Sequence, residues 1–249
     1  MLYLSNPRGI DREAQRASLD TLGRLNEMAE RRFGDPETAA RIQAYEMAYK
    51  LQASAPELMN LADESKETLA RYGLTDPNQP GYARNCLLAR RLLERGVRFV
   101  QLFHEAWDQH GDLTKNIKKN CGDTEQASAA LVMDLKERGL LDDTIVIWGG
   151  EFGRTPMSEK GNGRDHNPTG FTMWMAGAGV PGGTVIGATD EVGLRAIDDR
   201  MHVHDLHATI LHLMGLDHMG LIYTFKGRPE RPTLNEGVPN RRLVGTLPA

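Results

Sequence analysis

The residues best suited to chemistry lie in two short stretches of this sequence. The stretch 107–110 reads Trp-Asp-Gln-His, and the stretch 148–168 contains acidic, basic and imidazole side chains close together. Each follows an apolar run rich in β-branched residues, 97–103 and 144–148, which predicts a strand. In open parallel α/β sheets, ligands bind just outside the carboxyl ends of strands. We therefore expect both stretches to meet at one edge of a sheet.

Imidazoles and carboxylates in these stretches predict a metal site. The predicted ligands are Asp108, His110, Glu151, Asp165 and His166. Such a mixture suits Zn, Mn or Fe, whereas a site weighted toward carboxylates suits Mg or Ca, so the metal stays open. A single Asp-x-His in a loop is more often a solvated turn. Two clusters at successive strand ends make the metal interpretation as good as the solvated turn.

Arg154 is the predicted substrate-binding residue, because the N–H groups of its planar guanidinium can donate two parallel hydrogen bonds to phosphate or sulfate oxygens. A salt bridge to Glu151 or to another carboxylate is an equally good interpretation. The histidines at 202, 204, 207 and 212 raise the idea of a second metal site, but surface or capping roles are favoured. Trp107 and Trp148 are predicted to belong to the core rather than to a substrate platform.

Helices and strands are predicted to alternate along the chain. Apolar spacing and capping residues predict helices over 11–32, 36–55, 82–95, 127–139 and 204–215. In the first helix, one face consists of Ser18, Leu22, Leu25, Met28 and Ala29 and charges lie elsewhere, which predicts a long amphipathic helix. Strands are predicted over 97–103, 144–148, 171–176 and 182–187, with an irregular tail after Gly220. This alternation is typical of an α/β fold with a mostly parallel sheet.

Composition limits the classes of protein to which the chain can belong. With 249 residues and 40% hydrophobic content, it is predicted to form a single domain over 1–249, with 1–80 as a helical segment packed on it. A net charge of −4 argues against a nucleic-acid partner. No apolar run approaches the roughly 20 residues of a membrane-spanning helix. All eight histidines lie between His104 and His218, so the chemistry is expected in that part.

Several motifs resemble a known family. The stretch 139–151 resembles the strand of the alkaline phosphatase and sulfatase superfamily that ends in an acidic metal ligand, and 204–216 resembles a helix late in the sulfatase fold. Residues 151–156 and 163–167, with Trp-Asp-Gln-His upstream and Asn-Pro-Arg-Gly at 6–9, look like the bacterial family called domain of unknown function 1501. These motifs cover nearly the whole chain.

The resemblance implies a three-layer α/β/α fold like that of alkaline phosphatase. It implies that Asp108 and His110 bind one metal, that Glu151 stands at an acidic ligand position, and that His166 supplies the late histidine. Phe152 departs from the superfamily, where phosphatases have histidine. Nothing before Val97 resembles the superfamily's first strand, with its metal-binding aspartate and its nucleophile. We therefore expect the sequence to correspond to the C-terminal half to two-thirds of such a protein: a truncated product, a mis-assigned start or a degenerate relative.

The first functional hypothesis is a metal-dependent hydrolase of phosphate or sulfate esters, sulfatase-like, acting on a small-molecule or saccharide ester. Its nucleophile is not identifiable, because no Ser or Thr has the required context. The second hypothesis is a non-catalytic remnant of the fold that acts in binding or assembly. A third expectation is that the chain does not fold stably alone, since a parallel sheet without its first strands exposes apolar edges, which favours aggregation or self-association. The family resemblance implies an exported or periplasmic protein, normally behind a twin-arginine signal.

Overall fold

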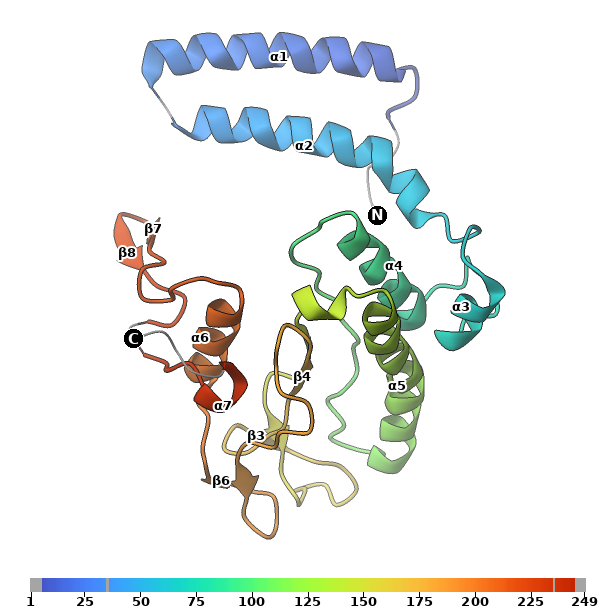
Figure 1. Ribbon diagram of the computed structural model, residues 1–249, viewed down its shortest axis with the longest axis vertical. Coiled ribbons are helices and arrows are strands. Elements are labelled where there is room, and N and C mark those ends of the chain that lie inside the picture. Colours follow the sequence, from blue (N-terminus) through green and yellow to red (C-terminus); the bar gives the residue numbers. More distant parts are fainter. Residues whose placement is uncertain (1–5, 35, 235, 245–249) are drawn as a thin grey trace.

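The computed structural model describes residues 6–34, 36–234 and 236–244. The helices in these ranges are α1 (Arg12–Phe33), α2 (Pro36–Met59), α3 (Lys66–Arg71), α4 (Tyr82–Glu94), α5 (Leu113–Glu137), a 3-10 turn η1 (Leu141–Asp143), α6 (Val203–Leu213) and α7 (Arg241–Val244). Figure 1 shows α1 and α2 as a hairpin that projects from the body formed by the other elements. None of the described helices is long and apolar enough to span a membrane.

Local capping explains where several helices begin and end. Asp11 accepts a hydrogen bond from the Ala14 amide at the start of α1, and Gly34 ends that helix with a φ of 66°, which costs glycine little. Ser65 caps α3 in the same way by accepting from the Thr68 amide. The predicted first, third and last helices are confirmed within one or two residues. The predicted second helix runs through Pro56 to Met59, and the fourth begins at Leu113 rather than near 127.

The apolar face predicted for the amphipathic helix α1 is largely exposed. Leu22, Leu25 and Met28 are 44%, 56% and 66% exposed. Polar side chains instead join α1 to α2, with the Arg16 guanidinium on the Glu46 carboxylate and the Gln15 amide donating to Gln52. The helical spacing therefore identified the helix correctly but not the face that it buries.

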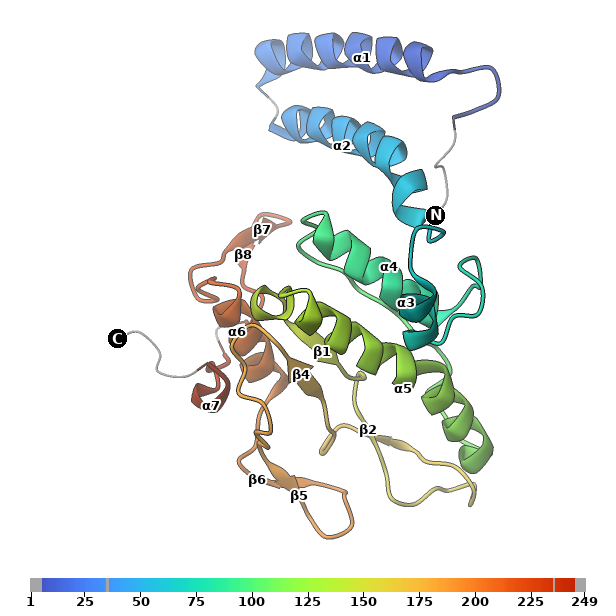
Figure 2. The same cartoon turned by 45° about the vertical axis from the view of Figure 1, so that its right-hand side comes forward.

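The core lies between α3, α4 and α5 (Figure 2). Its buried members are Leu61, Tyr72, Leu74, Cys86, Leu87, Leu88, Ala127, Ala130, Leu131 and Leu135. Leu102 and Val146 pack against it from the two segments that precede the chemical stretches. The core therefore supports both segments.

The predicted parallel sheet is wrong. The strands of the described residues form four separate two-stranded antiparallel pairs: β1 (Val146–Trp148) with β4 (Trp174–Ala176), β2 (Gly153–Arg154) with β3 (His166–Asn167), β5 (Ala188–Thr189) with β6 (Ala196–Asp198), and β7 (Tyr223–Phe225) with β8 (Arg228–Glu230). The described chain is thus neither three-layered nor mostly parallel. The strands predicted at 97–103 and 182–187 do not form, and the tail contains the β7–β8 hairpin and α7 rather than only irregular structure.

Burial explains why the sheet does not form. Parallel sheets have helices on both faces and are buried on both. Leu102 packs on the core, but Phe99 and Phe103 beside it are 72% and 79% exposed. The whole chain exposes 17279 Å², against about 11,000 Å² for a compact monomer of this mass. One face of the 97–103 segment therefore has a supporting layer and the other has none among the described residues.

Candidate metal centre

Three predicted ligands converge on one point. The Asp108 Oδ1 atom lies 2.9 Å from His166 Nε2 and 3.1 Å from His110 Nε2, and the two imidazole nitrogens are 3.2 Å apart. We call Asp108, His110 and His166 the ligand triangle. An ion at roughly 2.0–2.1 Å from all three atoms fits above a triangle of this size. Of the five predicted metal ligands, the structure brings these three together.

Two segments far apart in the sequence carry the triangle. In the β2–β3 ladder, Arg154 lies opposite His166. The loop before α5 carries Asp108 and His110, and its Gln109 carbonyl accepts a hydrogen bond from the Arg164 amide at 2.9 Å. Gly163 makes this approach feasible, because a Cβ there would lie 2.2 Å from the His110 carbonyl. Backbone contacts therefore set the spacing of the triangle.

Buried polar side chains hold both segments in place. Gln109 and Asn120 both donate to the Ala106 carbonyl, at 2.8 and 2.6 Å, which fixes the loop on α5. Next to His166, the buried Asn167 donates to the Leu194 carbonyl at 2.8 Å. In β3, Asn167 therefore points inward and His166 points toward the triangle.

Asp165 orients His110 rather than joining the triangle. Its Oδ1 lies 3.2 Å from His110 Nδ1, while Oδ2 accepts from the Glu159 amide at 3.0 Å. The Glu159 amide, and then His110, lower the pKa of Asp165 below its ordinary value, so it is an anion at neutral pH. A carboxylate on Nδ1 favours the tautomer whose Nε2 lone pair faces a metal. This is the usual outer-shell arrangement of a metal-binding histidine.

Arg154 bridges the triangle and Glu151. Its guanidinium donates to Asp108 Oδ1 at 2.5 Å and to Glu151 Oε1 at 3.1 Å. Hydrogen bonds from His166 and then from Arg154 lower the pKa of Asp108. The salt-bridge interpretation of Arg154 therefore describes this structure, with Glu151 as the named partner and Asp108 as the other carboxylate. Glu151 lies outside the triangle, on the far side of Arg154.

Aromatic rings lie behind the triangle. Trp107 and Trp148 are half-buried and meet edge to face at 6.0 Å, and Trp148 stacks on Trp174 at 6.5 Å. The Trp107 indole donates to His104 Nδ1 at 3.0 Å. Phe152 packs its ring on His166 at 4.5 Å. The tryptophans thus join the loop before α5 to β1 and β4. Phe152 packs on the ligand His166, whereas phosphatases have a ligand histidine at the position of Phe152.

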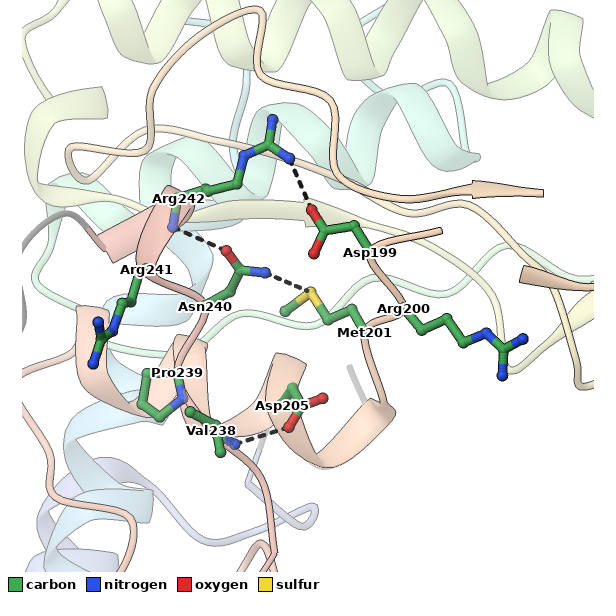
Figure 3. A pocket seen from close by; sticks show the side chains of 9 residues that line it. All are labelled: Asp199, Arg200, Met201, Asp205, Val238, Pro239, Asn240, Arg241 and Arg242. Atoms are coloured by element: carbon green, nitrogen blue, oxygen red, sulfur yellow. Dashed lines mark hydrogen bonds and ion pairs between the residues drawn. The ribbon is translucent and has the colours of Figure 1, made fainter. Parts of the chain in front are cut away.

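The triangle is an open site. The side chains of Asp108, His110 and His166 are 57%, 40% and 49% exposed. A hollow of about 400 Å³ lies elsewhere, beside α6, and is lined by residues such as Asp199, Asp205 and Arg242 (Figure 3). None of the predicted site residues lines it. An ion at the triangle would keep contact with water.

A second cluster that could hold a metal contains His202, His204 and Glu236, and its three ligand atoms lie within 4.8 Å of one another. The sequence drew attention to the two histidines but not to Glu236, which comes from a distant loop. Neither His207 nor His212 belongs to either of the two clusters found in the described part of the chain.

The chain matches a family described as "Protein of unknown function (DUF1501)" over residues 1–241. It belongs to this family. No curated protein and no solved structure shows a significant match. The resemblance noted from the motifs is thereby confirmed for the DUF1501 family, whose description names no activity.

Proposed function

We propose that this DUF1501 chain is a metal-dependent hydrolase of phosphate or sulfate esters. The observation that carries the proposal is the ligand triangle, in which two imidazole nitrogens and one carboxylate oxygen face each other at 2.9–3.2 Å. Two imidazoles and one carboxylate are a common protein ligand set for Zn²⁺ and also suit Mn or Fe. Ca²⁺ and Mg²⁺ fit less well, because they prefer oxygen ligands.

The remaining residues have roles that follow from their contacts. When bound, a divalent metal at this site would polarise an ester oxygen and lower the pKa of water. Asp165 would hold the His110 ring in its ligating orientation. Arg154 would bind an oxygen of the phosphate or sulfate group, and it would release Asp108 as the metal takes that carboxylate. Glu151 would then remain as the partner of Arg154.

The resemblance of 139–151 to the alkaline phosphatase and sulfatase superfamily supports ester hydrolysis as the reaction. It also supports an exported location. Phe152 argues against a full two-metal site, since it replaces a ligand with an apolar ring. No serine or threonine is assigned as nucleophile. A saccharide or other small-molecule ester remains the substrate class proposed.

A non-catalytic binding role is the second candidate, and the openness of the triangle favours it. Electrostatic catalysis gains most where water is excluded. Here, each side chain of the triangle is at least 40% exposed, and the hollow beside α6 lies away from it. Such a site would bind a metal or an anion without turning over an ester.

Metal analysis followed by an ester screen tests the proposal. The purified chain is dialysed against Zn²⁺, freed of excess ion, and its zinc measured beside His166→Ala and the control His207→Ala, which removes an exposed histidine outside both clusters. We expect His166→Ala to lose one ion and His207→Ala to lose none. Equal zinc in wild type and His166→Ala would refute the site.

The same samples then distinguish the two candidate functions. Aryl phosphate and aryl sulfate esters are incubated with the zinc-loaded chain. Hydrolysis that disappears in His166→Ala and persists in His207→Ala would support the hydrolase. Zinc that binds at the triangle without any hydrolysis would favour the binding role.

A further inference from the structure

We infer a second zinc site, built by His202 and His204 at the start of α6 and by Glu236 from the loop before α7. The His204 Nδ1 and Glu236 Oε2 atoms lie 3.1 Å apart, a separation that suits two ligands of one ion. The His202 ring lies 4.8 Å from the His204 ring, edge to face. The three residues share none with the ligand triangle, so this site does not depend on the proposed hydrolase.

The loop that carries Glu236 is held firmly against α6. The Val238 amide donates to Asp205 Oδ1 at 2.8 Å (Figure 3), and the Asn240 amide donates to Thr209 Oγ1 at 2.9 Å. Gly237 passes so close that a Cβ there would lie 2.4 Å from the His204 carbonyl oxygen. Glu236 is therefore placed next to His204 by its neighbours, before any ion binds.

The charge around the cluster also suits a cation. A helix start carries partial positive charge, which disfavours a metal. Asp205 offsets it, because its carboxylate accepts from the His202 amide at 2.8 Å in a capping box and also from Val238. Glu236 adds a second negative charge beside His204.

Zinc would replace weak contacts of the histidines. The His202 Nδ1 atom accepts from the His204 amide at 3.2 Å, and ligation by His202 would compete with that bond. Asp205 would keep its half of the capping box, so α6 would still begin at the same residue. The ion would thus join the loop at 236 to α6, with a fourth position open to water.

Zinc titration of the metal-free chain, followed by calorimetry, tests this site in the His166→Ala background, where the triangle is disabled. We expect one ion to bind to His166→Ala. We expect affinity to fall on the order of tenfold or more when Glu236→Gln is added, and to fall similarly with His204→Ala. Adding His207→Ala, on the same helix but outside the cluster, should change nothing. Glu236 is 71% exposed, so Glu236→Gln should fold normally.

The outcomes separate the two sites. No zinc bound to His166→Ala, or zinc unaffected by both Glu236→Gln and His204→Ala, would overturn this inference. If one ion is lost with His166→Ala and another with Glu236→Gln, both sites stand. Zinc that is lost only with Glu236→Gln would support this site and refute the triangle. An unfolding midpoint that zinc raises in His166→Ala, but not after Glu236→Gln is added, gives an independent readout.

Discussion

Two dense groups of charged side chains in this protein have opposite surroundings. The first, which we call the buried ionic cluster, consists of Glu64, Arg90, Arg91 and Asp134. Arg90 is 3% exposed and contacts Glu64 at 2.6 Å and Asp134 at 3.1 Å. The second is the ligand triangle with Arg154, which is open to water.

The two groups differ in which atoms face their carboxylate oxygens. In the buried ionic cluster, the acidic oxygens meet guanidinium groups or the Tyr72 hydroxyl, which donates to Asp134 at 3.0 Å. In the ligand triangle, two imidazole nitrogens and a carboxylate oxygen face one another, and only Arg154 supplies a permanent positive charge. In the first arrangement the carboxylates are neutralised by guanidinium groups of the chain, although Arg90 Nε and Arg91 Nε lack hydrogen-bond partners among the described residues, while the second arrangement is suited to an added cation. Counting the charged residues in each group would not have distinguished the two arrangements.

The largest effect is expected from Arg90→Ala. Removal of this guanidinium takes one charged partner from each of the buried carboxylates of Glu64 and Asp134, which should lower the free energy of unfolding by about 3–5 kcal/mol. Urea denaturation measures it. The control Lys119→Ala removes an exposed pair with Asp123 on α5 and should cost at most about 1 kcal/mol. If both variants lost the same free energy of unfolding, buried and exposed charges would contribute equally to stability, which would contradict the comparison.

Asp165→Asn should weaken metal binding at the triangle without abolishing it. The amide cannot fix the His110 tautomer as a carboxylate does, so affinity should fall about 10–100-fold while the triangle still holds one ion. Zinc titration in the Glu236→Gln background isolates the triangle. The control Glu159→Gln removes a nearby charge and keeps the backbone bond to Asp165. If both variants behave alike, Asp165 acts only through its charge.

Alkaline pH should weaken the buried region. Burial raises the pKa of the Cys86 thiol to about 12 and raises that of Tyr72. A group with a raised pKa contributes stability that is complete below its unfolded pKa and is lost as pH rises toward the folded value. The free energy of unfolding should therefore drop by roughly 2 kcal/mol between pH 8 and 10.5.

Cys86→Ala should flatten this dependence in urea denaturation at several pH values, and Cys121→Ala, which alters a less buried thiol, should not. A stability that stays constant up to pH 10.5 would contradict the assignment of Cys86 and Tyr72 as buried neutral groups.

The smallest effect is expected from Arg154→Ala. Because Arg154 competes for Asp108, its removal should raise zinc affinity at the triangle by about threefold. Binding of inorganic phosphate or sulfate to the zinc-loaded chain should weaken at the same time. Calorimetry measures both, with Arg164→Ala as the control from the same loop. Weaker zinc binding in Arg154→Ala would show that the arginine supports the triangle rather than competing with the ion.

Local sequence was sufficient to place α1, α4 and α6 within one or two residues and to indicate the chemical residues, but it did not predict α3 or the start of α5. Asp11, Ser65 and Gly34 act within one turn of the helices that they delimit, so their roles can be predicted from neighbouring residues. The Asp108-x-His110 spacing and the Asp165-His166 pair are also local, and they pointed to the right part of the chain. The face that α1 buries was not predictable, because it depends on where α2 lies.

Strand pairing and the division of roles within the site were decided only by the tertiary structure. A run such as 97–103 can be extended without pairing, since its partner must come from elsewhere in the chain. From the sequence alone, five residues are predicted as metal ligands, with no difference in role among them. The β2–β3 ladder and the Gly163–His110 contact bring three of them together, leave Asp165 behind His110 and direct Glu151 to Arg154. Residue types determine which atoms can bind a metal, but contacts between segments some 55 residues apart determine which of them meet.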